Sequence, residues 1–239
     1  MTPPVPPPEL LARIGEESAE SYLGAGRAIK TDVEALTGPL DDRSVLDFGC
    51  GCGRVLRHLG GAPVGVDIDA EAVAWVNANL GPSATAKTIR EAPPLPFDDA
   101  SFDVVVAVSV ITHLTDLWAE WLLELHRVLK PGGVLVASFF GEAYAPVLLP
   151  GFEWDDDRVG MLALGYGAPW SAGGPMVFFS EWWIRAHWGR AFEVEHLRTS
   201  GFAAPADGPS QGVALLRRRD VSLTPEDLRA PSARGSTTR

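Results

Sequence analysis

Residues 45–56 read Val45-Leu46-Asp47-Phe48-Gly49-Cys50-Gly51-Cys52-Gly53-Arg54-Val55-Leu56. The segment joins a short apolar strand, an acidic residue, three alternating glycines and the start of an apolar helix. Glycine is required where the backbone turns sharply or lies against a ligand, because a Cβ atom there would clash or exclude the ligand. The pattern predicts a ligand that lies against residues 49–53. A tight turn without a ligand is the alternative interpretation.

A dinucleotide-binding fingerprint competes with this interpretation of the glycines. That fingerprint has its third glycine three residues after the second, so that helix and strand pack closely while a pyrophosphate lies at the helix N-terminus. Arg54 occupies that position here. Asp47, which comes just before the glycines, would also repel a phosphate. The segment therefore favours a cationic or amine-bearing ligand.

Composition limits the class of protein and its partners. The 239 residues suffice for one α/β domain with a modest addition, and the formal net charge of -11 favours a small molecule over a nucleic acid. The two cysteines, Cys50 and Cys52, are too few for a thiolate metal site and poorly placed for a structural disulfide. The start lacks the features of a signal peptide, and no apolar run is long enough to span a bilayer. We expect a cytoplasmic protein with no membrane segment.

Strand and helix patterns alternate through the middle of the chain, which predicts an α/β fold with a mostly parallel sheet. The last two strands are joined by a turn-rich link, which predicts an antiparallel hairpin at one edge of the sheet. Strands are predicted over 43–48, 63–67, 85–90, 102–108, 133–140, 191–199 and 211–218, and helices over 53–59, 69–79, 115–129 and 180–190.

The flanking segments differ from this core in composition. Residues 1–8 and 220–239 are rich in Pro, Ser, Thr or Arg and are predicted to be disordered tails. Residues 9–40 form a helical N-terminal cap that ends at Gly38-Pro39. Residues 41–219 form the main domain, interrupted by an insert over 141–179.

Three segments in order resemble the class I S-adenosylmethionine (SAM) methyltransferases. Residues 47–53 match the Asp/Glu-x-Gly-x-Gly-x-Gly motif. Residues 90–103 resemble the Asp-Ala-x-x-Leu-Pro-Phe-x-x-x-x-Phe-Asp segment, and residues 127–133 match Arg-x-Leu-x-Pro-Gly-Gly. The chain is thus identified as a member of this family over residues 43–218. The resemblance implies a Rossmann-like, seven-stranded sheet with a C-terminal hairpin, helices on both faces, and SAM as the cofactor.

The predicted cofactor site extends beyond the glycines. Asp67 ends a strand where an acid accepts both ribose hydroxyl protons of a nucleoside, a geometry that NAD and SAM sites share, and Ile68 would lie on the adenine. The resemblance places Glu91 and Ala92 at the adenine amine, although Arg90 stands where the family has glycine; a solvated loop carboxylate is the alternative for Glu91. The expected cofactor contacts are Asp47, Gly49, Cys50, Gly51, Gly53, Asp67, Ile68, Glu91, Ala92 and Ser109.

Candidate bases lie at the carboxyl edge of the central strand over 102–108, where open α/β sheets bind ligands. Methyl transfer needs alignment and exclusion of water, with a base when the acceptor is a hydroxyl or an acidic carbon. Among Ser109, Thr112 and His113, we predict His113 as the catalytic base, since histidine titrates near neutral pH. A histidine that only caps and packs at the start of the next helix is the alternative.

The insert over 141–179 is the predicted substrate lid. It carries eight large apolar side chains without clear periodicity, which suggests a cover over an aromatic or apolar acceptor. A loop packed on the domain or on a second subunit is the alternative. The acidic run Asp155-Asp156-Asp157 is interpreted as a solvated turn and no metal ligand is assigned; a divalent ion that orients a catechol-like acceptor is the alternative. The large side chains are Tyr144, Phe152, Trp154, Met161, Tyr166, Trp170, Phe178 and Phe179.

We therefore expect a SAM-dependent methyltransferase that acts on a small molecule, as a monomer or homodimer. Whether oxygen, nitrogen or carbon is methylated stays open at this point. The competing hypotheses are a SAM-binding accessory or regulatory protein without catalysis, and a nicotinamide-dependent oxidoreductase.

Overall fold

A seven-stranded sheet forms the centre of the computed structural model, which describes residues 4–232 except 82, 156–157, 171–172 and 204–209. Strand order is β3-β2-β1-β4-β5-β9-β8. The first five strands in this order are parallel, and β9 runs antiparallel to both β5 and β8. The predicted fold class is confirmed. The bounds are β1 Val45–Phe48, β2 Val64–Asp67, β3 Thr85–Thr88, β4 Phe102–Ala107, β5 Leu129–Phe139, β8 Phe192–Phe202 and β9 Gln211–Arg218.

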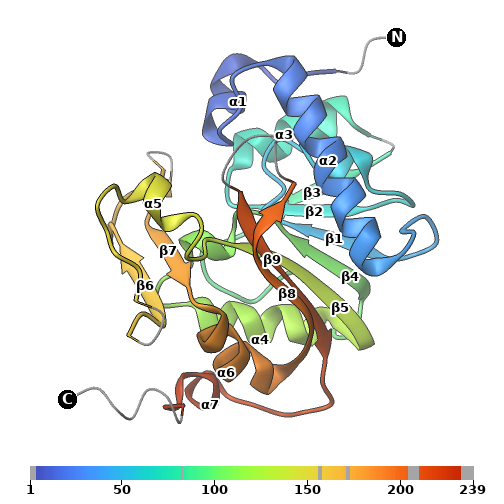
Figure 1. Cartoon of the computed structure of the whole chain (residues 1–239). Helices are drawn as coiled ribbons and strands as arrows, with labels where there is room; N and C mark the ends of the chain where they lie inside the picture. Colours follow the sequence, from blue (N-terminus) through green and yellow to red (C-terminus); the bar gives the residue numbers. More distant parts are fainter. Residues whose placement is uncertain (1–3, 82, 156–157, 171–172, 204–209, 233–239) are drawn as a thin grey trace.

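Alternate side chains of the central strands pack into two different hydrophobic cores, one on each face of the sheet. On β4, Val105 packs into the cluster that contains Trp121, while Val104 and Val106 pack into the cluster that contains Val33. A strand buried on both faces is apolar throughout for this reason. Helices α4 and α6 cover one face and α2 the other, and α3 lies beside β2 and β3 (Figure 1). These helices are α2 Ala19–Thr37, α3 Ala70–Asn79, α4 Trp118–Val128 and α6 Glu181–Ala191.

The N-terminal cap is two helices, α1 (Pro8–Arg13) and α2, instead of the continuous helical pattern. Gly15 separates them with a positive φ of 73°, and the Ser18 hydroxyl accepts from the backbone N–H of Ser21 to begin α2. The predicted tail over 1–8 is wrong for its second half, because Val5 packs on the apolar cluster beneath α1. Residues 1–3 lie outside the described residues.

The predicted tail over 220–239 is also wrong in part. Residues Pro225–Arg229 form helix α7, whose Leu228 is fully buried against the main core. His187 Nδ1 lies 2.7 Å from the carbonyl oxygen of Leu228, and Arg190 also donates to carbonyls of α7. The burial of Leu228 and the hydrogen bonds to the carbonyls of α7 fix this segment on the domain, although its composition is typical of a disordered tail. Residues 233–239 lie outside the described part of the chain.

Two of the predicted helices begin later than expected. Gly53 has a φ of 83°, so the glycine turn continues to residue 55 and is followed by only a short 3₁₀ helix, η1 (Leu56–His58), where a helix over 53–59 was predicted. A second 3₁₀ helix, η2 (Ile111–His113), precedes α4 and moves its start to Trp118.

The insert folds as a small unit beside the sheet. It contains α5 (Ala145–Leu148) and the antiparallel pair β6 (Met161–Leu164) and β7 (Met176–Phe179), seen at the left of Figure 1. The backbone N–H of Phe179 donates to the carbonyl of Phe140 at 2.8 Å, which fastens β7 to the end of β5. Within the described residues, we find no helix with the length and apolar character needed to cross a membrane.

Candidate active site

A cleft of about 920 Å³ opens where β1, β2 and β4 end. Strands β1 and β4 are neighbours, and the chain leads away from them to opposite sides of the sheet, which is where open α/β sheets bind ligands. Gly53 and Ala92 do not line this cleft. The predicted residues that do are Asp47, Gly49, Cys50, Gly51, Asp67, Ile68, Glu91, Ser109 and His113.

The glycine turn is tied to the neighbouring strand and to the loop after β4. The N–H groups of Gly49 and Cys50 both donate to the carbonyl of Val66, at 2.8 and 3.0 Å. Gly49 has a φ of 77°, and a Cβ atom there would lie 2.2 Å from Cγ2 of Val110. A Cβ at Gly53 would instead meet Cδ1 of Leu80 at 2.7 Å. The third glycine is thus required by packing on α3 and the first by the wall of the cleft.

Asp47 is the second-last residue of β1, next to the turn, and is 2 % exposed. Its Oδ2 atom has no hydrogen-bond partner among the described residues. Burial, with a smaller contribution from the charge of Asp67, raises the pKa of this carboxyl to about 7. A buried carboxylate oxygen without a partner is costly, and a cationic group in the cleft would remove that cost. The side chain is therefore poised to accept a positively charged ligand.

Asp67 ends β2 on the other side of the turn. Its Oδ2 accepts from the N–H of Gly51 at 2.6 Å, and its Oδ1 accepts from the N–H of Asp69 at 2.8 Å. Burial raises the pKa of Asp67, against the lowering effect of these two hydrogen bonds. A carboxylate has about four lone-pair positions, so the oxygens can still accept protons from two ligand hydroxyls.

The segment after β3 contributes backbone to the cleft. The carbonyl of Glu91 accepts from Nε1 of Trp121 at 3.1 Å, while the Glu91 side chain is exposed. Trp121 is 2 % exposed and lines the cleft from α4. The residue type and helical spacing of Trp121 indicate core packing. In the structure, Trp121 both packs in the core and lines the cleft.

Helix α1 and the turn after it form a wall that the sequence did not reveal in detail. Arg13 donates to Asp69 at 2.9 Å and to Glu71 at 2.7 Å, and Arg54 donates to Glu16 at 2.7 Å. These ion pairs connect the N-terminal segment to the start of α3 and to the glycine turn. The residues of the segment that line the cleft are Leu10, Arg13, Ile14 and Gly15.

His113 lies at the end of η2, on the side of the cleft next to the insert. Its Nδ1 is 2.7 Å from the carbonyl oxygen of Pro175. A carbonyl only accepts, so Nδ1 carries the proton and Nε2 of the neutral ring keeps its lone pair. Thr112 is fully buried and does not line the cleft. Of the candidate bases, His113 and Ser109 are brought to the cleft.

One described aromatic ring of the insert lines the cleft, while the others pack within the fold or, like Tyr166, are exposed. Trp170 lines the opening and is 41 % exposed. Phe178 and Phe179 are fully buried, and Tyr144 stacks on Phe140 with ring centroids 4.9 Å apart. The other residues of the insert that line the cleft are Gly167, Ala168, Pro169, Gly173 and Pro175.

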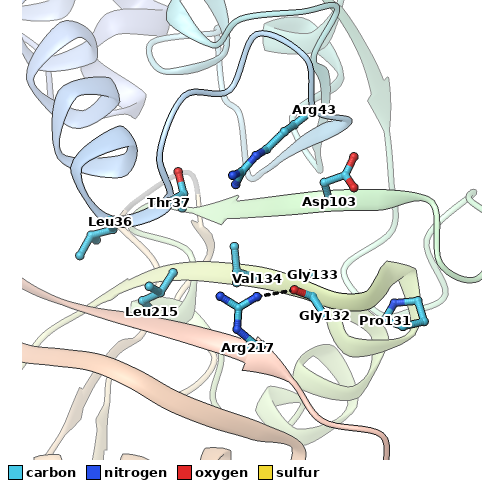
Figure 2. A pocket seen from close by; sticks show the side chains of 10 residues that line it. All are labelled: Leu36, Thr37, Arg43, Asp103, Pro131, Gly132, Gly133, Val134, Leu215 and Arg217. Atoms are coloured by element: carbon cyan, nitrogen blue, oxygen red, sulfur yellow. Dashed lines mark hydrogen bonds between the residues drawn. The ribbon is translucent and has the colours of Figure 1, made fainter.

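A second cavity, of about 230 Å³, lies at the opposite edge of the sheet. Figure 2 shows Arg43 and Asp103 on one side of it and Arg217 on the other, with Arg217 donating to the carbonyl of Gly132. This cavity contains none of the predicted site residues. It is also at the amino ends of β4 and β5, where parallel sheets do not place their ligands.

No group of three or more His, Cys, Asp and Glu side chains within the described ranges is placed to hold a metal ion. Asp155 of the acidic run lies 3.9 Å from Nε of Arg158. Asp156 and Asp157 lie outside the described residues.

Comparisons with known proteins agree with this geometry. Residues 46–137 match a family model described as a methyltransferase domain. A 2-methyl-6-phytyl-1,4-hydroquinone methyltransferase of Synechocystis sp. is 40% identical over 100 residues, which is 40% of this chain and 31% of that protein. A ubiquinone biosynthesis O-methyltransferase of Bradyrhizobium sp. is 38% identical over 102 residues, which is 39% of this chain and 38% of that protein. The chain spans about a third of the length of these two relatives.

The fold is shared with solved methyltransferases. A Burkholderia thailandensis 1,6-didemethyltoxoflavin-N1-methyltransferase, solved with bound 1,6-didemethyltoxoflavin and S-adenosylhomocysteine, superposes with a TM-score of 0.59 at 20% identity. The match covers 92% of this chain and 94% of that one. These matches show a methyltransferase domain over residues 46–137, and the sheet order gives the chain the fold of the class I SAM-dependent methyltransferases.

Proposed function

We propose that the chain binds SAM in the cleft and transfers its methyl group to a small-molecule acceptor that is aromatic or largely apolar. The observation that carries this proposal is Oδ2 of Asp47, which is buried beside the glycine turn and has no hydrogen-bond partner in the part of the chain that the structure describes. SAM brings an amino group and a sulfonium, both positively charged, so the residues fit this cofactor. A pyrophosphate next to the buried Asp47 and the half-buried Asp67 would be repelled, which disfavours the nicotinamide alternative.

Each wall of the cleft has a part in the proposed binding. Asp47 would take the positive charge of SAM, and Asp67 its ribose hydroxyls. Ile68 and the backbone of Glu91 would lie on the adenine. When bound, SAM supplies an electrophilic methyl group on a positively charged sulfur.

The chain's own residues then align the acceptor and remove its proton. Nε2 of His113 carries a lone pair that can take a proton from an acceptor hydroxyl, since Nδ1–H is held by Pro175. Trp170 and the backbone of the insert would cover the acceptor and exclude water. The acceptor, and whether its oxygen, nitrogen or carbon is methylated, are to be identified by screening metabolites with labelled SAM.

Calorimetric titration with SAM, S-adenosylhomocysteine and NADH tests the proposal. We expect binding heat with the first two ligands and none with NADH. Tight binding of NADH without SAM binding would favour the oxidoreductase. SAM binding without methyl transfer to any member of a panel of small aromatic and apolar metabolites, followed with labelled SAM, would favour a non-catalytic SAM-binding protein.

Asp67→Ala is expected to weaken SAM binding by about 5- to 150-fold, or roughly 1 to 3 kcal/mol, because the ribose hydroxyls lose an ionised acceptor. Asp67→Asn keeps one acceptor oxygen and should lie between wild type and the alanine variant. Asp98→Ala, at an exposed position, is the control. Unchanged affinity in a folded Asp67→Ala protein would remove this residue from the site.

A further inference from the structure

Three side chains beside the cleft form a closed ring of hydrogen bonds across three strands. The N–H of Ser109, just after β4, donates to Oγ of Ser138 on β5 at 2.8 Å. Oγ of Ser138 donates to Oε1 of Gln211 on β9 at 2.6 Å. Nε2 of Gln211 donates to Oγ of Ser109 at 2.7 Å. Ser138 is fully buried.

The direction of these bonds follows from the one donor that cannot be reversed, the backbone N–H of Ser109. Ser138 accepts from it, so the buried Ser138 hydroxyl satisfies its own proton by giving it to Gln211. The Gln211 atom that receives this proton must be the amide oxygen. The amide nitrogen therefore faces Ser109, and the Ser109 oxygen must accept.

The Ser109 hydroxyl proton is left for a group outside this ring. Within the described parts of the chain, no acceptor for it is found, and Ser109 lines the cleft. Ser109 also has a φ of 59°, in the left-handed region that strains a residue with a Cβ atom. A strained backbone conformation persists only where surrounding contacts fix it, and here the ring of hydrogen bonds fixes the conformation of Ser109.

The position of Ser109 distinguishes between the two ligands of the cleft. The acids and glycines of the cofactor site lie at the ends of β1 and β2, whereas both partners of Ser109 lie on β5 and β9, on the other side of β4. Only Val110 separates Ser109 from η2, which carries His113. The hydroxyl thus belongs to the half of the cleft that contains His113 and the insert.

We propose that Ser138 and Gln211 are positioning residues that make the Ser109 hydroxyl an obligatory hydrogen-bond donor to an oxygen of the methyl acceptor. The substrate class is then a small aromatic molecule with a carbonyl or phenol oxygen at this point. This inference rests on the proposed methyl transfer. It assigns Ser109 to the acceptor, in place of the cofactor contact predicted from the sequence.

Two pairs of probes test the proposal by NMR titration of the free and the S-adenosylhomocysteine-loaded protein. Acetophenone and α-methylstyrene differ by a carbonyl oxygen, and phenol and toluene by a hydroxyl. We expect the oxygen-bearing member of at least one pair to bind about 3- to 10-fold more tightly than its partner, the contribution of one hydrogen bond. The pair that shows the preference identifies the kind of oxygen.

Three variants should abolish this preference without changing the affinity for S-adenosylhomocysteine. Ser109→Ala removes the hydroxyl and keeps the positive φ, while Ser109→Gly removes the hydroxyl and relieves the strain. Gln211→Glu places a carboxylate oxygen against Ser109, which turns the hydroxyl proton away from the cleft. Thermal unfolding of each variant shows that the fold is kept.

Several results would overturn the proposal. They are equal or undetectable binding of both members of each pair by the wild type, a preference that survives in Ser109→Ala, and a preference that Ser109→Gly retains. A Ser109→Ala protein whose affinity for S-adenosylhomocysteine falls by the same factor would show that the hydroxyl serves the cofactor. Failure of the wild type to bind S-adenosylhomocysteine contradicts the proposed function instead.

Discussion

His113→Gln is expected to lower turnover by about 10²- to 10⁴-fold if the acceptor is a hydroxyl, the usual range for loss of a positioned base. Glutamine can still donate to the carbonyl of Pro175, so the contact between η2 and the insert is kept. What is lost is the lone pair of Nε2. The affinity for SAM and the melting temperature should therefore stay near the wild-type values.

The measurement follows methyl transfer from labelled SAM to an acceptor found in the metabolite panel, together with SAM affinity and thermal unfolding. His196→Gln is the matched control, because His196 is exposed on β8 and away from the cleft. A His113→Gln protein with lower stability and full turnover per folded molecule would show that the histidine only caps and packs. Alignment of the reactants would then carry the reaction.

Asp47→Asn is expected to make the ligand-free protein more stable above pH 7, by roughly 2 to 4 kcal/mol. The pKa of Asp47 is about 7 in the folded protein, against 3.8 for an unperturbed aspartate. Between these two values the folded state holds a proton that the unfolded state has lost, so the wild type loses stability as pH rises. The asparagine variant has no such loss. Urea unfolding at pH 4 and pH 8 should show similar stabilities at the first pH and the difference at the second.

The same substitution is expected to weaken SAM binding by at least about 30-fold, because the positive charge of the ligand loses its buried partner. Wild-type affinity should fall about tenfold for each pH unit below 7, since binding requires the ionised carboxylate. The variant should show no such dependence. A wild-type affinity that is flat between pH 5.5 and 8 would contradict the assigned role of Asp47.

Asp103 offers a control with the opposite sign. Burial would raise its pKa, but hydrogen bonds from Lys130 and Ser44 outweigh that effect and lower the pKa to about 2. It lies beside the smaller cavity of Figure 2, at the edge of the sheet away from the cleft. Asp103→Asn should lower stability at neutral pH and leave SAM binding unchanged.

The sheet could be predicted from sequence because its information is local. Each parallel strand is a short apolar run between turn residues, and the glycines of residues 49–53 need positive φ angles that other residues avoid. The ends of the chain were predicted less well. Leu228 and Val5 are single apolar residues in proline-rich surroundings, and their packing depends on distant partners that no local pattern reveals.

In the candidate site, too, the features set by local sequence could be predicted and the contacts between distant residues could not. Asp47 and Asp67 lie in the last two positions of parallel strands that end at one edge, so their convergence is a consequence of the fold. The contacts of His113 with Pro175 and of Ser109 with Gln211 join residues 62 and 102 positions apart, and neither partner has a residue type that suggests chemistry. Arg54 could be noted for its place after the glycines, but its ion pair with Glu16 could not.

The last strand of the sheet lies inside it, since β9 is paired with both β5 and β8. The segment that matches the family model ends at residue 137, within β5. A ribosome that had made only this much would hold a chain whose longest parallel strand presents an open edge, and such edges pair with other chains. Synthesis must reach residue 218 before that edge is covered. The free edge of β5 is thus covered only in a late step, after β9 has been made.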